Sequence, residues 1–164
     1  MLKKILDFIF GGLIKTNVSS KNLKGTNQLF YDHVKADLIE DEGYKLKLYE
    51  CPAGKLTIGI GYNIQDNGIS DAIAEALFKE KYIECYTALL RIFPNFESYT
   101  WNRRKALINM IYQLGETKFR KFSNTINYIK AEAFDLASAE MLDSMWAKQT
   151  PNRAKKIAGM IKRG

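Results

Sequence analysis

The apolar periodicity of the sequence changes at Glu42–Gly43, and this change constrains the fold more than any other feature. Before it, apolar residues recur at every fourth position from Phe30 to Leu38. That spacing places them on one face of a helix, which we expect over residues 28–42. Gly43 follows at the position where a glycine commonly ends a helix. The Glu42 side chain is therefore expected at the end of a rigid element.

Residues 44–63 carry the alternating pattern of β-strands, in the sequence YKLKLYECPAGKLTIGIGYN. Leucine and isoleucine alternate with polar residues or glycine on both sides of residues 52–55, which have the composition of a turn. The pattern predicts a β-hairpin of two short strands, with Cys51 near its tip. A loop is expected over residues 64–69, because this segment contains a turn signal.

The rest of the chain has helical periodicity. Helices are expected over residues 71–93, 98–114, 123–131, 134–146 and 151–162. The predicted fold class is α+β: a small hairpin lobe at about 43–70, a long connecting helix at about 71–93, and a larger helical lobe at about 94–164 that includes helix 28–42. Three residues in helical context are expected in the core: Cys85, Trp101 and Trp146.

The N-terminal residues 1–27 divide into an apolar segment and a polar linker, KTNVSSKNLKGTN, at residues 15–27. In the apolar segment, two lysines precede the run IFGGLI, but Asp7 interrupts it and no cleavage site follows. The segment is also shorter than the ~20 residues that span a bilayer. Two interpretations remain: an amphipathic helix that packs on the protein or a partner, or a membrane-surface anchor or export signal in residues 1–14.

The 164-residue chain has a formal net charge of +7, which favours anionic partners such as nucleic acid, anionic lipid or bacterial cell wall. A nucleic-acid role is disfavoured, because no recognition motif accompanies the basic residues near the C-terminus. Two cysteines are too few for a disulfide scaffold, and they and the single histidine, His33, lack metal-ligand spacing. We expect no metal and no cofactor.

Glu42 is the candidate for acid chemistry. Hydrolysis of a glycosidic bond needs one carboxylic acid to protonate the leaving oxygen and a second group to act on water or the sugar. Tyrosines 44, 49 and 62 could supply apolar surface and stack on sugar rings. A solvated glutamate at a helix end is the common alternative.

Four segments of the sequence resemble the T-even phage lysozymes, glycoside hydrolase family 24. They are DEGYKLKLYE, GKLTIGIGYN, RRKALINMIYQLGET at residues 103–117 and QTPNRAKK at residues 149–156. The resemblance implies a lysozyme domain at residues 28–164, with a cleft between its two lobes. It also implies cleavage of the β-1,4 bond between N-acetylmuramic acid and N-acetylglucosamine in peptidoglycan.

The family's catalytic pattern is a glutamate, eight residues, an aspartate or cysteine, five residues and a threonine. Glu42, Cys51 and Thr57 fit this spacing. The resemblance makes Glu42 the general acid and gives Thr57 a role in positioning water, with Cys51 in the place of the usual aspartate. It implies substrate contacts at Asn63, Tyr112, Gln113 and Thr125. Glu140 stands where the T-even enzyme has a substrate-contacting amide, so that contact is not carried over.

Three roles are open for Cys51: a base or electrostatic partner to the attacking water, a nucleophile on the sugar, or a residue that fills space. We favour the first. A thiolate at neutral pH would need local stabilisation, because a free thiol has a pKa of ~8.5.

The leading functional hypothesis is a monomeric phage or prophage endolysin used in host lysis. A lytic transglycosylase on the same bond and a non-catalytic wall-binding protein are the alternatives. The enzyme is expected to be made in the bacterial cytoplasm and to act on the periplasmic wall, after export by a holin-type pore or by the N-terminal segment.

Overall fold

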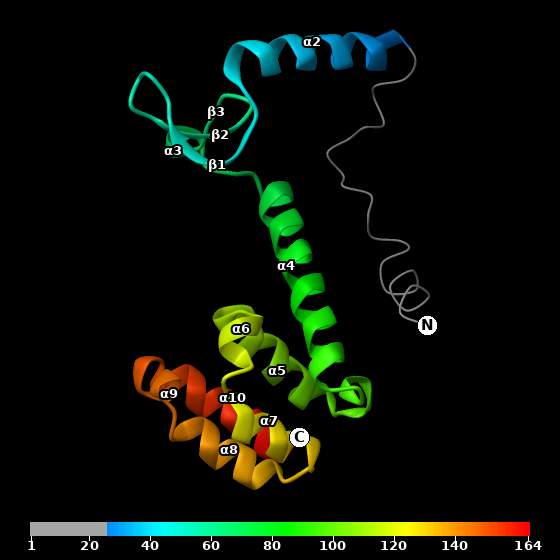
Figure 1. Ribbon diagram of the computed structural model, residues 1–164, viewed down its shortest axis with the longest axis vertical. Helices are drawn as coiled ribbons and strands as arrows, with labels where there is room; N and C mark the ends of the chain where they lie inside the picture. The colour runs from blue at the N-terminus through cyan, green and yellow to red at the C-terminus, as the bar shows by residue number, and fades with distance from the viewer. Residues whose placement is uncertain (1–25) are drawn as a thin grey trace. The chain divides into compact units, whose positions relative to one another are not determined.

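The computed structural model describes residues 26–164, which form helices and one small antiparallel sheet (Figure 1). The predicted α+β class is confirmed. The described residues form two compact units that divide between Leu77 and Phe78. The predictions for the N-terminal segment at residues 1–14 lie outside the described residues. No helix among residues 26–164 is long and apolar enough to cross a membrane.

The first unit begins with helix α2, Thr26–Glu42, where a helix over residues 28–42 was predicted. Gly43 ends it with a φ of +77°, a conformation that costs glycine little, and its N–H donates to the Ile39 carbonyl at 2.9 Å. The sequence therefore located the end of α2 and the position of Glu42.

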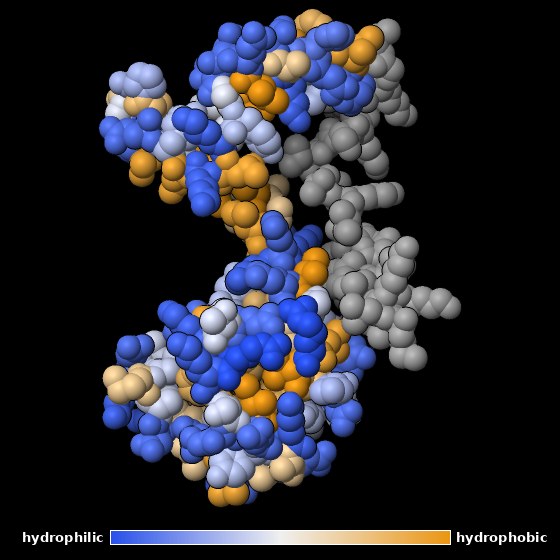
Figure 2. Space-filling view, viewed as in Figure 1, coloured by the Kyte–Doolittle hydropathy of each residue, from blue (hydrophilic) through white to orange (hydrophobic). Residues whose placement is uncertain are grey.

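A three-stranded antiparallel sheet follows, in the order β1 (Lys45–Glu50), β2 (Leu56–Gly59), β3 (Tyr62–Asn63). The β1–β2 hairpin was predicted, whereas the two-residue strand β3 was not. Thr57 lies on the central strand, opposite Tyr49 of β1 and Asn63 of β3. Leucines 46, 48 and 56 are exposed, and apolar side chains lie at the surface of the sheet (Figure 2).

The loop predicted over residues 64–69 is wrong for its first four residues, which form the short helix α3, Ile64–Asn67. The Asn63 side chain caps this helix by accepting a hydrogen bond from the Asp66 N–H at 3.1 Å. Four residues are too few to show a helical apolar period, so the prediction missed α3. The long helix α4, Asp71–Ile92, then begins where it was expected.

The second unit contains the predicted helices and two short ones that were missed. Its elements are η2 (Phe96–Ser98), α5 (Trp101–Leu114), α6 (Glu116–Phe119), α7 (Ser123–Lys130), α8 (Phe134–Leu142), α9 (Met145–Gln149) and α10 (Pro151–Arg163). The helix predicted over residues 134–146 is interrupted at Ser144, where the backbone angles are extended. The Ser144 Oγ caps the next helix, α9, by accepting a hydrogen bond from the Ala147 N–H at 3.1 Å.

Helix α10 is central to the core of the second unit and packs on α8, α5 and α9. Its residues Ala154, Ile157, Ala158 and Ile161 recur at helical spacing and are each at most 1% exposed. Burial of Cys85 and Trp146 is confirmed, since they are 3% and 5% exposed. Burial of Trp101 is wrong: this residue is 71% exposed at the first position of α5.

Candidate active site

The Glu42 carboxyl lies close to the backbone of the turn between β2 and β3. A Cβ atom placed on Gly61 would lie 2.8 Å from Oε2 of Glu42 and 3.0 Å from its Cδ. Gly61 also has a φ of +62°, which side chains other than glycine's rarely allow. The backbone conformation of the turn therefore favours glycine, and a side chain at this position would also displace the Glu42 carboxyl from its observed place.

Cys51 lies in the tight loop between β1 and β2. Its N–H donates to the Lys55 carbonyl at 3.0 Å, and its own carbonyl accepts from the Gly54 N–H at 2.8 Å. These bonds fold residues 51–55 so that the thiol approaches the start of β2. The Cys51 side chain is half-buried and forms no disulfide.

Hydrogen bonds lower the pKa of the Cys51 thiol below its ordinary value. The largest cause is the Lys55 backbone amide, followed by the Ala53 backbone amide, and the Thr57 hydroxyl adds to them while partial burial opposes them. Each of these donors stabilises the thiolate. The loop thus provides the local stabilisation that a thiolate at position 51 requires, mainly from its own backbone rather than from a lysine ammonium.

Thr57 is 2% exposed, and its Oγ1 donates to the Lys55 carbonyl at 3.0 Å. This bond uses the hydroxyl proton and leaves the oxygen lone pairs able to accept from the Cys51 thiol or from water. When Cys51 ionises, the hydroxyl can instead turn its proton toward the sulfur. Cys51 and Thr57 therefore form a pair whose hydrogen bonding depends on the charge of the sulfur.

Asn63 takes part in a polar network that supports this loop. Its Nδ2 donates to Asp66 Oδ2 at 3.0 Å, and Lys55 Nζ lies 3.1 Å from the same oxygen. The Asn63 hydrogen bond, followed by that of Lys55, holds the pKa of Asp66 below its ordinary value. Both polar ends of the Asn63 side chain are thus engaged within the protein. The predicted substrate contact at Asn63 stays a prediction.

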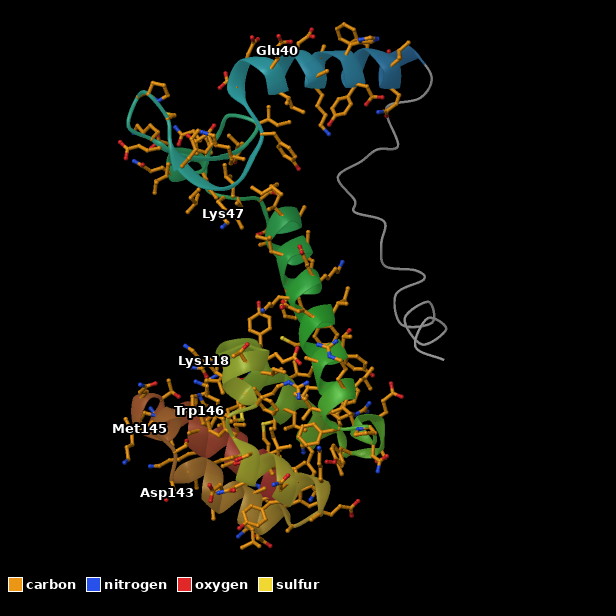
Figure 3. All side chains as sticks on the ribbon, viewed as in Figure 1. Glu40, Lys47, Lys118, Asp143, Met145 and Trp146 are labelled. Atoms are coloured by element: carbon orange, nitrogen blue, oxygen red, sulfur yellow. The ribbon has the colours of Figure 1, made fainter. Side chains whose placement is uncertain are left out.

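Three candidate substrate-contacting residues lie in the second unit. Tyr112 is 38% exposed on α5, with its ring centroid 6.0 Å from that of Phe78. The neighbouring Gln113 accepts a hydrogen bond at 3.0 Å through Oε1 from Nε1 of Trp146, which α9 carries (Figure 3). Thr125, on α7, is 1% exposed. Trp146 was predicted as core alone, and its role in holding Gln113 was missed.

The structure brings Cys51 and Thr57 together on adjacent strand ends, and it places Glu42 against Gly61 in the same unit. The backbone groups of Lys55 were missed, although they contact both Cys51 and Thr57. The motif Gly59-Ile60-Gly61 was a usable signal for the close approach of another group. Among residues 26–164, no group of three or more histidine, cysteine or acidic side chains could hold a metal ion.

A sequence profile described as phage lysozyme matches residues 39–164, a span that includes Glu42, Cys51 and Thr57. The chain belongs to the phage lysozyme family. It is therefore a lysozyme, a hydrolase. The expected resemblance to T-even phage lysozymes is confirmed.

Individual relatives agree with this assignment. "Probable T4-type lysozyme 2" of Dictyostelium discoideum is 29% identical, over 76% of this chain and 90% of the relative. "Endolysin" of Acyrthosiphon pisum secondary endosymbiont phage 1 is 32% identical, over 74% of this chain and 83% of the relative. The "Pre-baseplate central spike protein Gp5" of Enterobacteria phage T4 is 25% identical over 77% of this chain, which corresponds to 27% of that longer protein.

We predict that Gly61→Ala reduces lysozyme activity about 100-fold, because its Cβ would displace the Glu42 carboxyl by a few tenths of an ångström or more. Gly68→Ala is the matched control: Gly68 has the same φ of +62°, but beyond its chain neighbours no heavy atom lies within 4 Å of the place that the new Cβ would occupy. In both variants, backbone strain should lower the free energy of unfolding by a similar amount, roughly 1–2 kcal/mol.

The two measurements are the rate at which each variant clears a cell-wall suspension and its thermal unfolding midpoint. Equal activity loss in the two variants would contradict a specific contact with Glu42.

Proposed function

We propose that this lysozyme is a phage or prophage endolysin that hydrolyses the β-1,4 bond between N-acetylmuramic acid and N-acetylglucosamine in peptidoglycan. The observation that carries the proposal is the ordered set of Glu42, Cys51 and Thr57 at the spacing typical of the family, with Cys51 held in a loop that favours its thiolate. Membership of the phage lysozyme family and the endolysin relative support the substrate class.

In the proposed reaction Glu42 acts as general acid. Its carboxylic proton goes to the glycosidic oxygen as the bond from that oxygen to the anomeric carbon breaks. A water molecule attacks the anomeric carbon, and the water oxygen forms the new bond. The Glu42 side chain lies next to Gly61 and is exposed, so its carboxyl is accessible to a substrate.

Cys51 and Thr57 act on the attacking water. The Thr57 hydroxyl directs its proton to the Lys55 carbonyl or to the thiolate, and its oxygen accepts a hydrogen bond from the water and orients it. The Cys51 thiolate accepts the proton that the water releases, or stabilises the positive charge that develops on the sugar. Donation by the Lys55 and Ala53 amides supports this role, since it makes the thiolate available.

The substrate lies outside the cytoplasmic membrane. We propose that the enzyme is synthesised in the host cytoplasm and reaches the wall through a holin-type pore or by means of residues 1–14. Its formal net charge of +7 would favour association with the anionic wall once it is exported.

Product analysis tests the reaction class. Mass spectrometry of digested peptidoglycan should find fragments with reducing muramic acid ends. Fragments with 1,6-anhydro ends would instead identify a lytic transglycosylase, which needs an acid but no activated water. Binding of peptidoglycan with no soluble fragment released would identify a non-catalytic protein.

We predict that Glu42→Gln lowers activity by at least about 100-fold, since glutamine cannot donate the catalytic proton. Its thermal unfolding midpoint should stay close to that of the wild type. Glu40→Gln is the matched control, because Glu40 is an exposed acid on the same helix (Figure 3). Near-normal activity in the Glu42 variant would remove the central claim, whatever the control shows.

We predict that Cys51→Asp remains active and that Cys51→Ala loses activity about 100-fold, because alanine can neither bind a proton nor carry charge. Wild-type activity should rise with pH through the lowered Cys51 pKa, because the active form is the thiolate. In the aspartate variant this rise should move to about pH 4.

Iodoacetamide should inactivate the wild type and spare Cys51→Asp. Cys85 provides the internal control, since it is 3% exposed and burial raises the pKa of its thiol. An alanine variant as fast as the wild type would show that the thiol has no chemical role.

A further inference from the structure

Both candidate groups of the β1–β2 loop depend on the backbone of Lys55. Its carbonyl accepts hydrogen bonds from the Cys51 N–H and from Thr57 Oγ1, each at 3.0 Å. Its N–H is the largest cause of the lowered Cys51 pKa, and such a bond weakens steeply when the N–H no longer points at its acceptor. A small displacement of the Lys55 backbone would therefore disturb the thiol and the hydroxyl together.

Two neighbouring residues of α3 hold this part of the strand from outside the loop. Asp66 binds the Lys55 ammonium, with Nζ 3.2 Å from Oδ1 and 3.1 Å from Oδ2. Gln65 Oε1 accepts a hydrogen bond from the backbone N–H of the next residue, Leu56, at 3.1 Å. Helix α3 packs on β2 (Figure 1). Lys55 is thus held through its side chain and through the backbone directly after it.

Both ends of α3 are attached to β3. At the first end, Asn63 caps the helix, and its Nδ2 donates to Asp66 Oδ2 at 3.0 Å. At the other end, the Tyr62 hydroxyl donates to the Gly68 carbonyl at 2.9 Å. A helix of four residues is not stable by itself, so these attachments keep Gln65 and Asp66 directed at β2.

The ion pair between Asp66 and Lys55 is exposed, so it contributes little to the stability of the whole protein. The two side chains are 48% and 41% exposed, and exposed pairs of this kind are weak. Asp66 also does not act on the thiol directly. The causes of the lowered Cys51 pKa are hydrogen bonds, opposed by partial burial, and none is a charge on the surrounding Glu42, Glu50, Lys55 or Asp66. The effect of the pair is therefore local and passes through the position of Lys55.

We infer that Gln65 and Asp66 are positioning residues for the Cys51 thiol, and that they act by fixing the backbone of Lys55. The spacing that identifies the candidate catalytic residues includes neither of them. Their importance for activity rests on the proposed function, in which the thiolate acts on the attacking water. The ionisation of the thiol can nevertheless be measured without substrate.

Charge and position predict opposite changes when Asp66 is replaced by a neutral residue. Loss of the carboxylate leaves the Lys55 ammonium unpaired, and the added positive charge would stabilise the thiolate and lower the Cys51 pKa. Loss of position weakens donation from the Lys55 N–H, which raises the Cys51 pKa. Gln65 carries no charge, so its replacement tests position alone.

The experiment measures the rate of Cys51 alkylation by iodoacetamide as a function of pH in the full-length protein, with the modified peptides quantified by mass spectrometry. In Asp66→Ala and in Gln65→Ala, the midpoint of the rise should move upward by about half a pH unit or more. Asp66→Asn should move it less than Asp66→Ala, because its amide oxygen can still accept from Lys55. The pH profile of wall clearing should move by the same amount as the alkylation midpoint.

Asn67→Ala is the matched control. Asn67 is an exposed residue of the same helix, and its side chain forms no hydrogen bond within residues 26–164. It should leave the midpoint unchanged. Cys85 reports folding, because it is 3% exposed and its alkylation should stay slow in every folded variant.

Three results would overturn the inference: a midpoint that falls in Asp66→Ala, one that does not move in Gln65→Ala, or one that rises equally in Asn67→Ala. Failure of the proposed function is distinguishable from these results. In that case the alkylation midpoint would still move upward in both variants, while wall clearing would not follow it.

Discussion

The contact between the Glu42 side chain and the backbone at Gly61 is the constraint on which the arrangement of the first unit depends. It joins the end of α2 to the turn between β2 and β3, and the observed position of the carboxyl depends on the absence of a side chain at position 61. Gly43 also contributes to this contact, because its positive φ ends α2 directly after Glu42 and lets the chain turn into the sheet. The candidate acid therefore lies where the ends of two elements meet, and it is exposed to solvent there.

Cys51 and Thr57 are positioned by main-chain groups of one loop. The loop from Cys51 to Lys55 aims backbone N–H groups at the sulfur, while the Lys55 carbonyl holds the Thr57 hydroxyl. Asp66 secures the same loop from α3 through Lys55, and Asn63 completes the network. Acid and thiol are thus supported by separate contacts, although both belong to one small sheet and its flanking helices.

Local periodicity explains how much of the fold could be predicted. Helix α2, the β1–β2 hairpin and α4 each extend over enough residues to show their repeat, so they were found. Strand β3 and helix α3 are too short to show one. The break at Ser144 was missed because the apolar pattern continues through it, and only the cap geometry reveals it. Trp101 is exposed because it occupies the first turn of α5, a position that apolarity alone does not indicate.

Only the part of the candidate site that depends on intervals between residues in the sequence could be predicted. Glu42, Cys51 and Thr57 follow from intervals in the sequence, but the approach of Glu42 to Gly61 depends on how α2 meets the sheet. The capping role of Asn63 and the bond from Trp146 to Gln113 likewise join elements whose proximity no interval encodes. Contacts of this kind require the fold.

The backbone amides around Cys51 affect which residue types this position can accept during evolution. Main-chain N–H groups are present whatever the side chains of the loop are, so they would stabilise a carboxylate at position 51 as readily as a thiolate. A lineage can then exchange aspartate for cysteine without rebuilding the surroundings of the charge. The exchange brings with it sensitivity to oxidants and alkylating agents, which a carboxylate does not have.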